Sequence, residues 1–213
     1  MNKERRSNAG VKVAVLLAAL GTAAGNASAG GQTKSAWYRV TVQATSQMDI
    51  PQELLKEGQD SATTIFAAIH VQLIWSGQVP SSSQTSPCVD ESATSNLVLQ
   101  IVPHAPANVS NVALAMAMPH ANSGVRLIVF YERVDPLLRS HHAPQGKVLG
   151  YVLAHEIAHV LQGISRHSDV GIMRPRWTDN DFRQMGIGAL TFTNEDVRLI
   201  RRRFEVQATS AAC

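Results

Sequence analysis

The chain has 213 residues, with 19 basic and 16 acidic side chains and a formal net charge of +3. Residues 1–29 carry four basic residues and one acidic residue, so residues 30–213 carry 15 of each sign and are neutral. Neutrality gives no electrostatic reason to expect binding to nucleic acid, and a hydrophobic content of 45% excludes a disordered chain. Two cysteines, Cys88 and Cys213, are too few for a disulfide scaffold, and whether they pair stays open.

The first 29 residues are typical of a secretory signal peptide. A basic start precedes the apolar run Val13–Leu20, and Ala27–Ala29 fits the A-x-A cleavage pattern. We therefore expect a secreted or periplasmic protein whose single mature domain is 30–213. The apolar run is shorter than the about 20 residues that cross a bilayer, so an uncleaved membrane anchor is the less favoured alternative. No later stretch could span a membrane.

The periodicity of apolar residues predicts the elements in chain order. Alternating β-branched residues predict a strand at Tyr38–Ala44, and apolar residues at three- and four-residue steps predict a helix of about 18 residues from Pro51. The later elements expected are strands at Val71–Trp75, Leu97–Val102, Val112–Met118 and Val125–Val134, a surface loop at Gly77–Ser95, and helices over Lys147–Gln162 and from about Thr193. This order predicts an α+β fold with a mixed, twisted sheet of four or five strands.

The segment His155–Met173 carries the residues with the clearest chemistry. It begins with the H-E-x-x-H pattern. Residues four apart share one face of a helix, so His155 and His159 can bind one metal ion. Glu156 lies about 100° around the helix from His155 and can serve as a general base beside the ion. Zinc suits these imidazoles and needs no redox partner.

A third histidine follows at a short distance along the chain. The helix is apolar over a broad surface and is expected to end at Gly163, beyond which a turning chain can bring His167 to the metal. Three protein ligands and one water make up the catalytic zinc arrangement. Met173 comes six residues later, with Pro175 after it to favour a turn. An accidental H-E-x-x-H on an ordinary helix is the alternative that these further residues disfavour.

Through these residues the sequence resembles the metzincin zinc peptidases. Their motif is H-E-x-x-H-x-x-G-x-x-H followed by a turn bearing Met. The chain is most similar to the matrixin-like branch, because Ser168 follows the third histidine and Thr191–Arg198 looks like the start of that branch's last helix. The chain also looks like small secreted bacterial proteins that carry this site. The resemblance implies a metzincin-like fold in which a sheet packs on the active-site helix.

The resemblance also implies a role for each site residue. The zinc ligands would be His155, His159 and His167, the general base would be Glu156, and the residue of the Met-turn would be Met173. The spacing departs from the family pattern, because His167 lies eight residues after His159 where the family has six. A longer loop can still return a ligand, since the cost of loop closure depends weakly on length.

A second candidate for the third ligand lies on the closing helix. Glu195 follows His159 by 36 residues, and in the gluzincin peptidases a downstream helical glutamate binds the zinc. We favour His167, because Thr193 has the position of an N-cap and Glu195 would complement the positive end of the helix. Metal content of the two alanine variants separates these ligands.

The sequence thus predicts a zinc-dependent endopeptidase that acts on a peptide or protein substrate. One alternative is a zinc-containing, non-proteolytic cell-surface binding module, and another is a metallohydrolase of a non-peptide amide. Glu156 favours an enzyme, because a structural zinc site has no need of a base. The strand Val125–Val134 is either an edge strand that pairs with an extended substrate or a core strand, and its alternation does not separate the two.

Overall fold

The computed structural model describes part of the chain, within the compact unit Ser35–Cys213. The described residues are 37–76, 94–110, 113–118, 125–140 and 142–211. The expected signal peptide, both cysteines and nearly all of the expected loop at Gly77–Ser95 lie outside them. Within these ranges no helix has the length and apolar character needed to cross a membrane.

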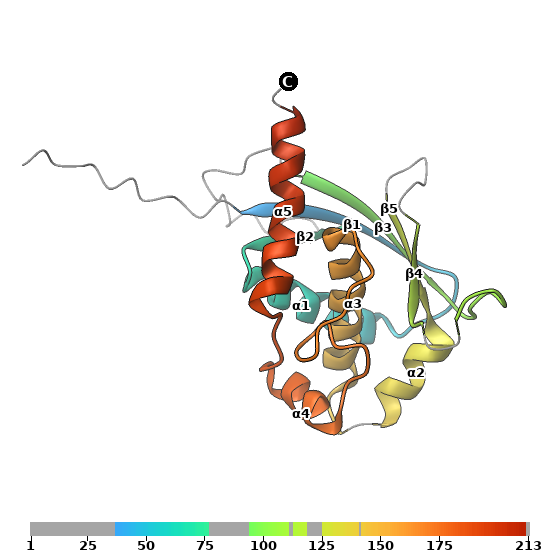
Figure 1. Cartoon of the computed structure of the whole chain (residues 1–213). Coiled ribbons are helices and arrows are strands. Elements are labelled where there is room, and N and C mark those ends of the chain that lie inside the picture. The colour runs from blue at the N-terminus through green and yellow to red at the C-terminus, as the bar shows by residue number, and fades with distance from the viewer. Residues whose placement is uncertain (1–36, 77–93, 111–112, 119–124, 141, 212–213) are drawn as a thin grey trace, which may run out of the picture. The chain divides into compact units, whose positions relative to one another are not determined.

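Five strands form one mixed sheet (Figure 1). Their order across the sheet is β2-β1-β3-β5-β4. The strands β2, β1, β3 and β5 run parallel to one another, whereas β4 pairs antiparallel with β5 at one edge of the sheet. The strands are β1 (Tyr38–Ser46), β2 (Val71–Trp75), β3 (Thr94–Val102), β4 (Ala115–Met118) and β5 (Val125–Phe130). The α+β class and the five-stranded mixed sheet therefore agree with the prediction.

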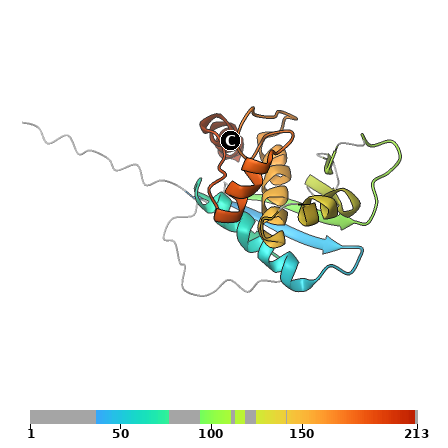
Figure 2. The same ribbon diagram turned by 90° about the horizontal axis from the view of Figure 1, so that it is seen from below.

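One face of the sheet is covered by helices. In β1, Val40 and Val42 are fully buried, whereas the alternate residues Arg39 and Thr41 are partly exposed. This alternation is what a strand with one buried face requires. The two views of the ribbon place α1 (Gln52–Ala67) and α3 (Gln145–Gln162) side by side on that face (Figures 1 and 2).

The helices α1 and α3 approach each other closely because glycines lie at their crossing. A Cβ atom on Gly58 of α1 would lie 2.8 Å from Cγ of Leu149, and one on Gly150 of α3 would overlap Ser61. Glycine in a helix interior costs about 1 kcal/mol relative to alanine, so Gly58 weakens α1 by itself. The close approach of α3, which carries the candidate site, explains why a glycine lies at position 58, because a side chain there would collide with Leu149.

Two helices were not predicted from the sequence. The strand expected at Val125–Val134 ends at Phe130, and α2 (Tyr131–Ser140) begins at the next residue. The helix α4 (Asp179–Ile187) starts at the N-cap Thr178, where a reciprocal pair of hydrogen bonds with Asp181 forms a capping box. Glycine in the left-handed conformation, Gly188, ends α4.

The strand expected at Val125–Val134, for which an edge and a core position were both open, takes the core position. Because β5 pairs with β3 on one side and with β4 on the other, Val125–Phe130 is an interior strand. The edge on this side of the sheet is β4, which begins at Ala115 and is shorter than the predicted Val112–Met118. The closing helix α5 (Asn194–Ala211) follows Thr193, whose hydroxyl accepts a hydrogen bond from the Asp196 backbone N–H at 3.2 Å. The prediction of Thr193 as N-cap is therefore confirmed.

Candidate metal centre

The helix α3 runs through the core and carries two of the histidines. Every residue from Val148 to Gln162 is buried except His159, which is partly exposed. Gly163 ends the helix with a φ of 68°, in the left-handed region that glycine adopts without strain. Its backbone N–H bonds to the carbonyl oxygens of His159 and Val160. The chain can therefore turn away about one helical turn after His159.

His155 is fixed in one tautomer by the backbone. Its Nδ1 lies 2.8 Å from the carbonyl oxygen of Ile172, and because a carbonyl only accepts, Nδ1 carries the proton. The lone pair of Nε2 is then free to bind a metal. Burial lowers the pKa of His155 to about 4, so the imidazole is neutral at physiological pH. Neutral imidazole is the form that binds metal ions.

The three histidines come together at the end of α3. The two Nε2 atoms of His155 and His159 are 3.1 Å apart, and ligand atoms of His155, His159 and His167 all lie within 4.8 Å of one another. Two nitrogens bound to tetrahedral zinc at about 2.0–2.1 Å would be separated by about 3.3 Å. The donor set and the 3.1 Å between the two α3 nitrogens therefore fit zinc, which His155, His159 and His167 would hold.

The loop after Gly163 delivers His167, which is exposed, beside the two helical imidazoles. The neighbour of His167 in sequence anchors this loop. The Ser168 backbone N–H donates to the Met173 carbonyl at 2.9 Å, and the Ser168 hydroxyl donates to Asp196 at 2.7 Å. Arg166 donates to the same Asp196 carboxylate at 3.0 Å. These bonds anchor Arg166 and Ser168, the two sequence neighbours of His167, and so hold His167 at the site.

A tight turn lies between the third histidine and Met173. Gly171 has a φ of 78°, and its carbonyl accepts a hydrogen bond from Arg174 N–H at 3.2 Å. The Ile172 N–H donates to the Thr191 carbonyl at 3.0 Å. Met173 is completely buried in the main core. The sequence-predicted turn is present, and its backbone supplies the carbonyl of Ile172 that orients His155.

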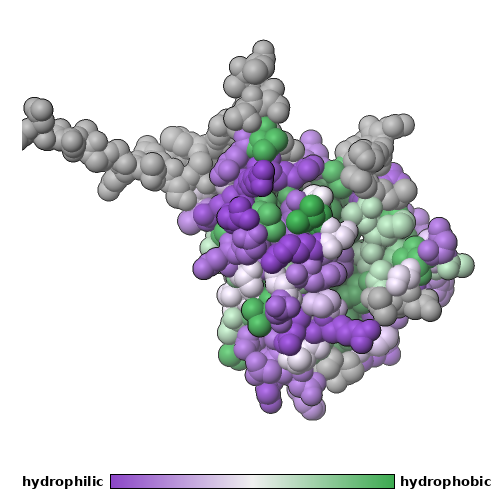
Figure 3. Space-filling model, viewed as in Figure 1, coloured by the Kyte–Doolittle hydropathy of each residue, from purple (hydrophilic) through white to green (hydrophobic). Residues whose placement is uncertain are grey.

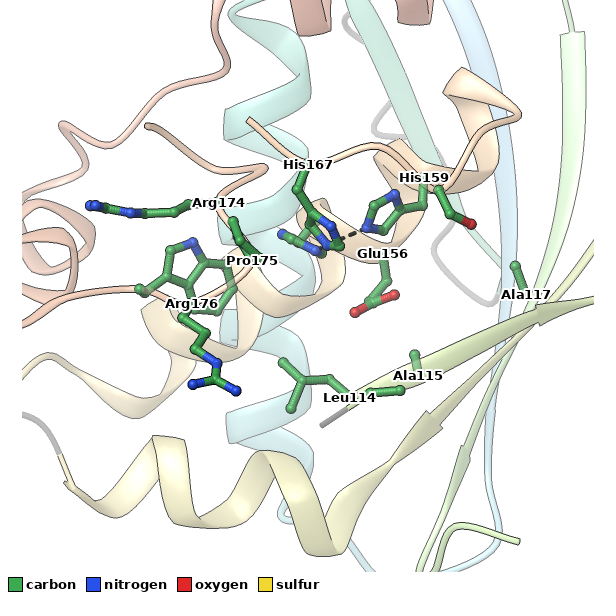
Figure 4. Close-up of a pocket in the computed structure, with 13 residues that line it drawn as sticks. Leu114, Ala115, Ala117, Glu156, His159, His167, Arg174, Pro175 and Arg176 are labelled. Carbon is green, nitrogen blue, oxygen red and sulfur yellow. Dashed lines mark hydrogen bonds between the residues drawn. The ribbon is translucent and has the colours of Figure 1, made fainter. Parts of the chain in front are cut away.

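Glu156 is the buried acid of the site. Its side chain is 9% exposed, and burial raises the pKa of its carboxyl to about 7. Figure 4 shows the carboxyl group between the histidines and strand β4. It lines the same cleft as the three histidines. This position is next to the imidazoles and open to a molecule in the cleft.

Glu195, the competing ligand, lies elsewhere. Its carboxylate accepts two hydrogen bonds from the Arg198 guanidinium, at 2.8 and 2.7 Å. The side chain is exposed and is not part of the metal-ligating group, which among the described residues consists of the three histidines. The hydrogen bonds of Glu195 match the expected role at the positive start of α5.

A cleft of about 530 Å³ opens above the histidines. One wall is the start of β4 and the residues before it, and the other is Arg174–Trp177, as Figure 4 shows. In Figure 3, hydrophobic residues gather near β4, whereas hydrophilic residues predominate over α4 and α5. Trp177 lines this cleft and also packs the turn, since its indole N–H donates to the Ile172 carbonyl at 3.1 Å.

The sequence did not reveal the supporting residues. Asp196 and Arg166 are 30 positions apart, and only the fold brings them together. The pattern of Thr193 followed three residues later by Asp196 was a readable sign of a capping box, but not of the contact with Ser168. The wall formed by Leu114 and Ala115 was not predicted, because the strand order that places β4 at the edge of the sheet has no local signature in the sequence.

Comparisons with known proteins give little beyond this geometry. No protein-family model matches the chain, and no curated protein matches its sequence. Solved structures similar to it include archaemetzincin from Methanopyrus kandleri, with 13% sequence identity and a TM-score of 0.44. That match covers 81% of this chain and 98% of the archaemetzincin chain. A likeness of this size carries no assignment of activity, which rests on the site itself.

Proposed function

We propose that this protein is a zinc-dependent endopeptidase. The observation that carries the proposal is the juxtaposition of three convergent imidazoles with a buried carboxyl group at the floor of an open cleft. A purely structural zinc site closes its fourth coordination position with protein. Here the histidines and Glu156 line a cleft of about 530 Å³, which has room for a substrate. This favours an enzyme over a binding module that uses zinc only for stability.

Each side chain of the site has a defined part in this function. His155, His159 and His167 would hold Zn²⁺, with His155 oriented by the Ile172 carbonyl. Bound zinc supplies Lewis-acid chemistry, which polarises a carbonyl and makes water more acidic. Glu156 would accept the proton of the attacking water and then donate it to the leaving amine. In the metal-free chain burial raises the pKa of Glu156 to about 7; bound Zn²⁺ would lower this pKa, because a nearby positive charge favours the carboxylate, which is the form that accepts a proton.

The edge strand β4 offers a place for the substrate backbone. It pairs with β5 on one side, and no other described strand pairs with its second side. An extended peptide can add to such an edge through main-chain hydrogen bonds. Leu114 and Ala115 lie across the cleft from Glu156 (Figure 4). A peptide along β4 would therefore present its backbone to the base.

The function is tested with the purified chain loaded with Zn²⁺. We expect hydrolysis of casein and of a mixed peptide pool, its loss on chelation and its recovery when Zn²⁺ is restored. Glu156→Gln should lower kcat/KM by about 100-fold or more, because a general base contributes about 10²–10⁴-fold. Glu195→Gln, an exposed carboxylate outside the cleft, is the matched control. Cleavage that survives both chelation and Glu156→Gln would refute the proposal.

The proposed site of action is outside the cytoplasm. Residues 1–29 have the charge, apolar run and small residues of a cleavable leader, and a neutral mature chain offers no attraction to nucleic acid. Cell fractionation and N-terminal sequencing of the exported protein test both parts. The expected mature N-terminus is Gly30.

A further inference from the structure

The cleft contains two arginines that differ in their surroundings. Arg174 donates to Asp181 at 3.1 Å, and this carboxylate also accepts hydrogen bonds from the Thr178 backbone N–H and hydroxyl at 2.7 and 2.8 Å. Arg174 therefore has a counter-charge and ties the cleft wall to the start of α4. Its charge is largely neutralised within the fold.

Arg176 has no such partner. Its side chain is exposed, and among the described residues no carboxylate forms an ion pair with it. It lines the cleft together with the three histidines and Glu156. In Figure 4 its side chain lies below Pro175, and Leu114 lies to its right, on the other wall. The one carboxyl group among the residues that line the cleft is Glu156, the proposed base, so the positive charge of Arg176 is not balanced there.

The backbone on both sides of Arg176 is fixed. Pro175 restricts its own backbone, and Trp177 is held by its hydrogen bond to the Ile172 carbonyl. The Trp177 ring also stands edge-on to the rings of His155 and Phe182, with centroid distances of 5.5 and 6.1 Å. The backbone that carries Arg176 is therefore held at the cleft wall.

We infer that Arg176 is a specificity residue that binds a carboxylate of the substrate next to the scissile bond. The inference rests on the peptidase function proposed above and adds to it a substrate class, peptides with Asp or Glu beside the cleavage point. A guanidinium binds a carboxylate through two parallel hydrogen bonds. A carboxylate at the free C-terminus of a substrate has the same chemistry.

The test uses internally quenched peptides and the full chain loaded with Zn²⁺. One cleaved sequence is varied to Asp, Asn or Lys at each of the two positions on either side of the scissile bond, with an amidated C-terminus. At one position we expect kcat/KM for Asp to exceed that for Asn about tenfold. Arg176→Gln should reduce this ratio to about one, and Arg176→Glu should invert it in favour of Lys.

The control is Arg183→Glu, which makes the same charge change at an exposed arginine of α4 outside the cleft. It should keep the wild-type ratio. The same peptides with a free C-terminus separate the two sources of carboxylate. If only the free-acid peptides show the Arg176-dependent gain, the C-terminus and not a side chain is bound, and the inferred substrate class is wrong. An unchanged Asp-to-Asn ratio in Arg176→Glu overturns the role of Arg176 itself.

A second readout separates this inference from the proposed activity. Binding of the Asp and Asn peptides to the zinc-loaded chain is measured by fluorescence anisotropy. If no peptide is cleaved but the Asp peptide binds more tightly and Arg176→Gln removes the difference, the peptidase function fails and carboxylate recognition stands. If the peptides are cleaved but Arg176→Gln changes neither their binding nor their kcat/KM, the inference of carboxylate recognition is wrong and the peptidase function stands.

Discussion

At the scale of single residues, the buried carboxyl group of Glu156 has a cost that depends on pH. Burial raises its pKa from 4.5 to about 7. A carboxyl group with a higher pKa in the folded than in the unfolded chain holds its proton more tightly when folded. The free energy of unfolding therefore falls as the pH rises from about 4.5 to about 7, and the loss is complete above that. Each pKa unit corresponds to about 1.4 kcal/mol.

We therefore expect Glu156→Gln to stabilise the metal-free chain at pH 8 by about 3 kcal/mol. The gain should shrink to nearly zero at about pH 3.5, because Glu156 is then protonated in both states. Urea unfolding in the presence of a chelator measures both values. Glu195→Gln, at an exposed position, should change neither. A gain of the same size at both pH values would mean that packing, and not ionisation, causes the difference in stability between the wild type and Glu156→Gln.

The residues that do the proposed chemistry could be predicted from the sequence because their geometry is local. Positions four apart on a helix share a face, so His155 and His159 needed only the helix. The third histidine needed only a chain reversal after Gly163. The groups that orient these histidines could not be predicted from the sequence. The Ile172 carbonyl lies 17 residues from His155, and its position depends on a turn whose contact with Thr191 no local pattern encodes.

At the scale of elements, Asp196 joins the loop that carries His167 to the start of α5. Its carboxylate is completely buried and accepts hydrogen bonds from Thr193, Ser168 and Arg166. Burial acts to raise the pKa of Asp196, but these hydrogen bonds outweigh it and hold the pKa below its usual value. The charged form therefore stabilises the fold above about pH 4, and this contribution is lost as the pH falls through the lowered pKa.

Asp196→Asn should lower the free energy of unfolding by about 2 kcal/mol at pH 7, because an amide cannot accept all of these hydrogen bonds. The difference from wild type should narrow at pH 3. Since the loop with His167 loses its anchor, zinc affinity should fall about tenfold. Urea unfolding and competition with a fluorescent zinc chelator measure the two effects. Glu195→Gln, in the same helical turn, should show neither. Unchanged zinc affinity in Asp196→Asn would show that the loop is held by other contacts.

Helices and strands could be predicted where a single sequence pattern is present, and their boundaries were predicted wrongly where a strand pattern runs into a helix pattern. The strand β2 and the end of α3 at Gly163 matched, because β-branched alternation and a C-terminal glycine are strong local signals. The boundary between β5 and α2 was missed because apolar and aromatic residues continue across it. Pro136 in the interior of α2 also argues against a helix. Here tertiary packing outweighs local preference.

At the scale of the whole molecule, the candidate site joins parts that are distant in sequence. Two ligands lie on α3, which packs against α1 and the sheet, and the third lies on a loop anchored to α5. The strand order could not be predicted, because parallel pairs such as β1 with β3 connect residues separated by an entire helix and another strand. Long-range pairing has no local signature in the sequence. A metal ion at this junction would connect the core to its C-terminal part.

Zinc should therefore stabilise the whole fold and not only the loop. An ion that binds the folded chain alone, at about 1,000 times its Kd, adds about 4 kcal/mol, which corresponds to a rise in Tm of about 10 °C for a domain of this size. Thermal unfolding with Zn²⁺ and with chelator measures this rise in the full chain. His167→Ala should remove most of it, since two imidazoles bind zinc more weakly than three. Glu195→Ala should keep all of it, because Glu195 is paired with Arg198. The reverse result, a rise lost in Glu195→Ala and retained in His167→Ala, would place the third ligand on α5.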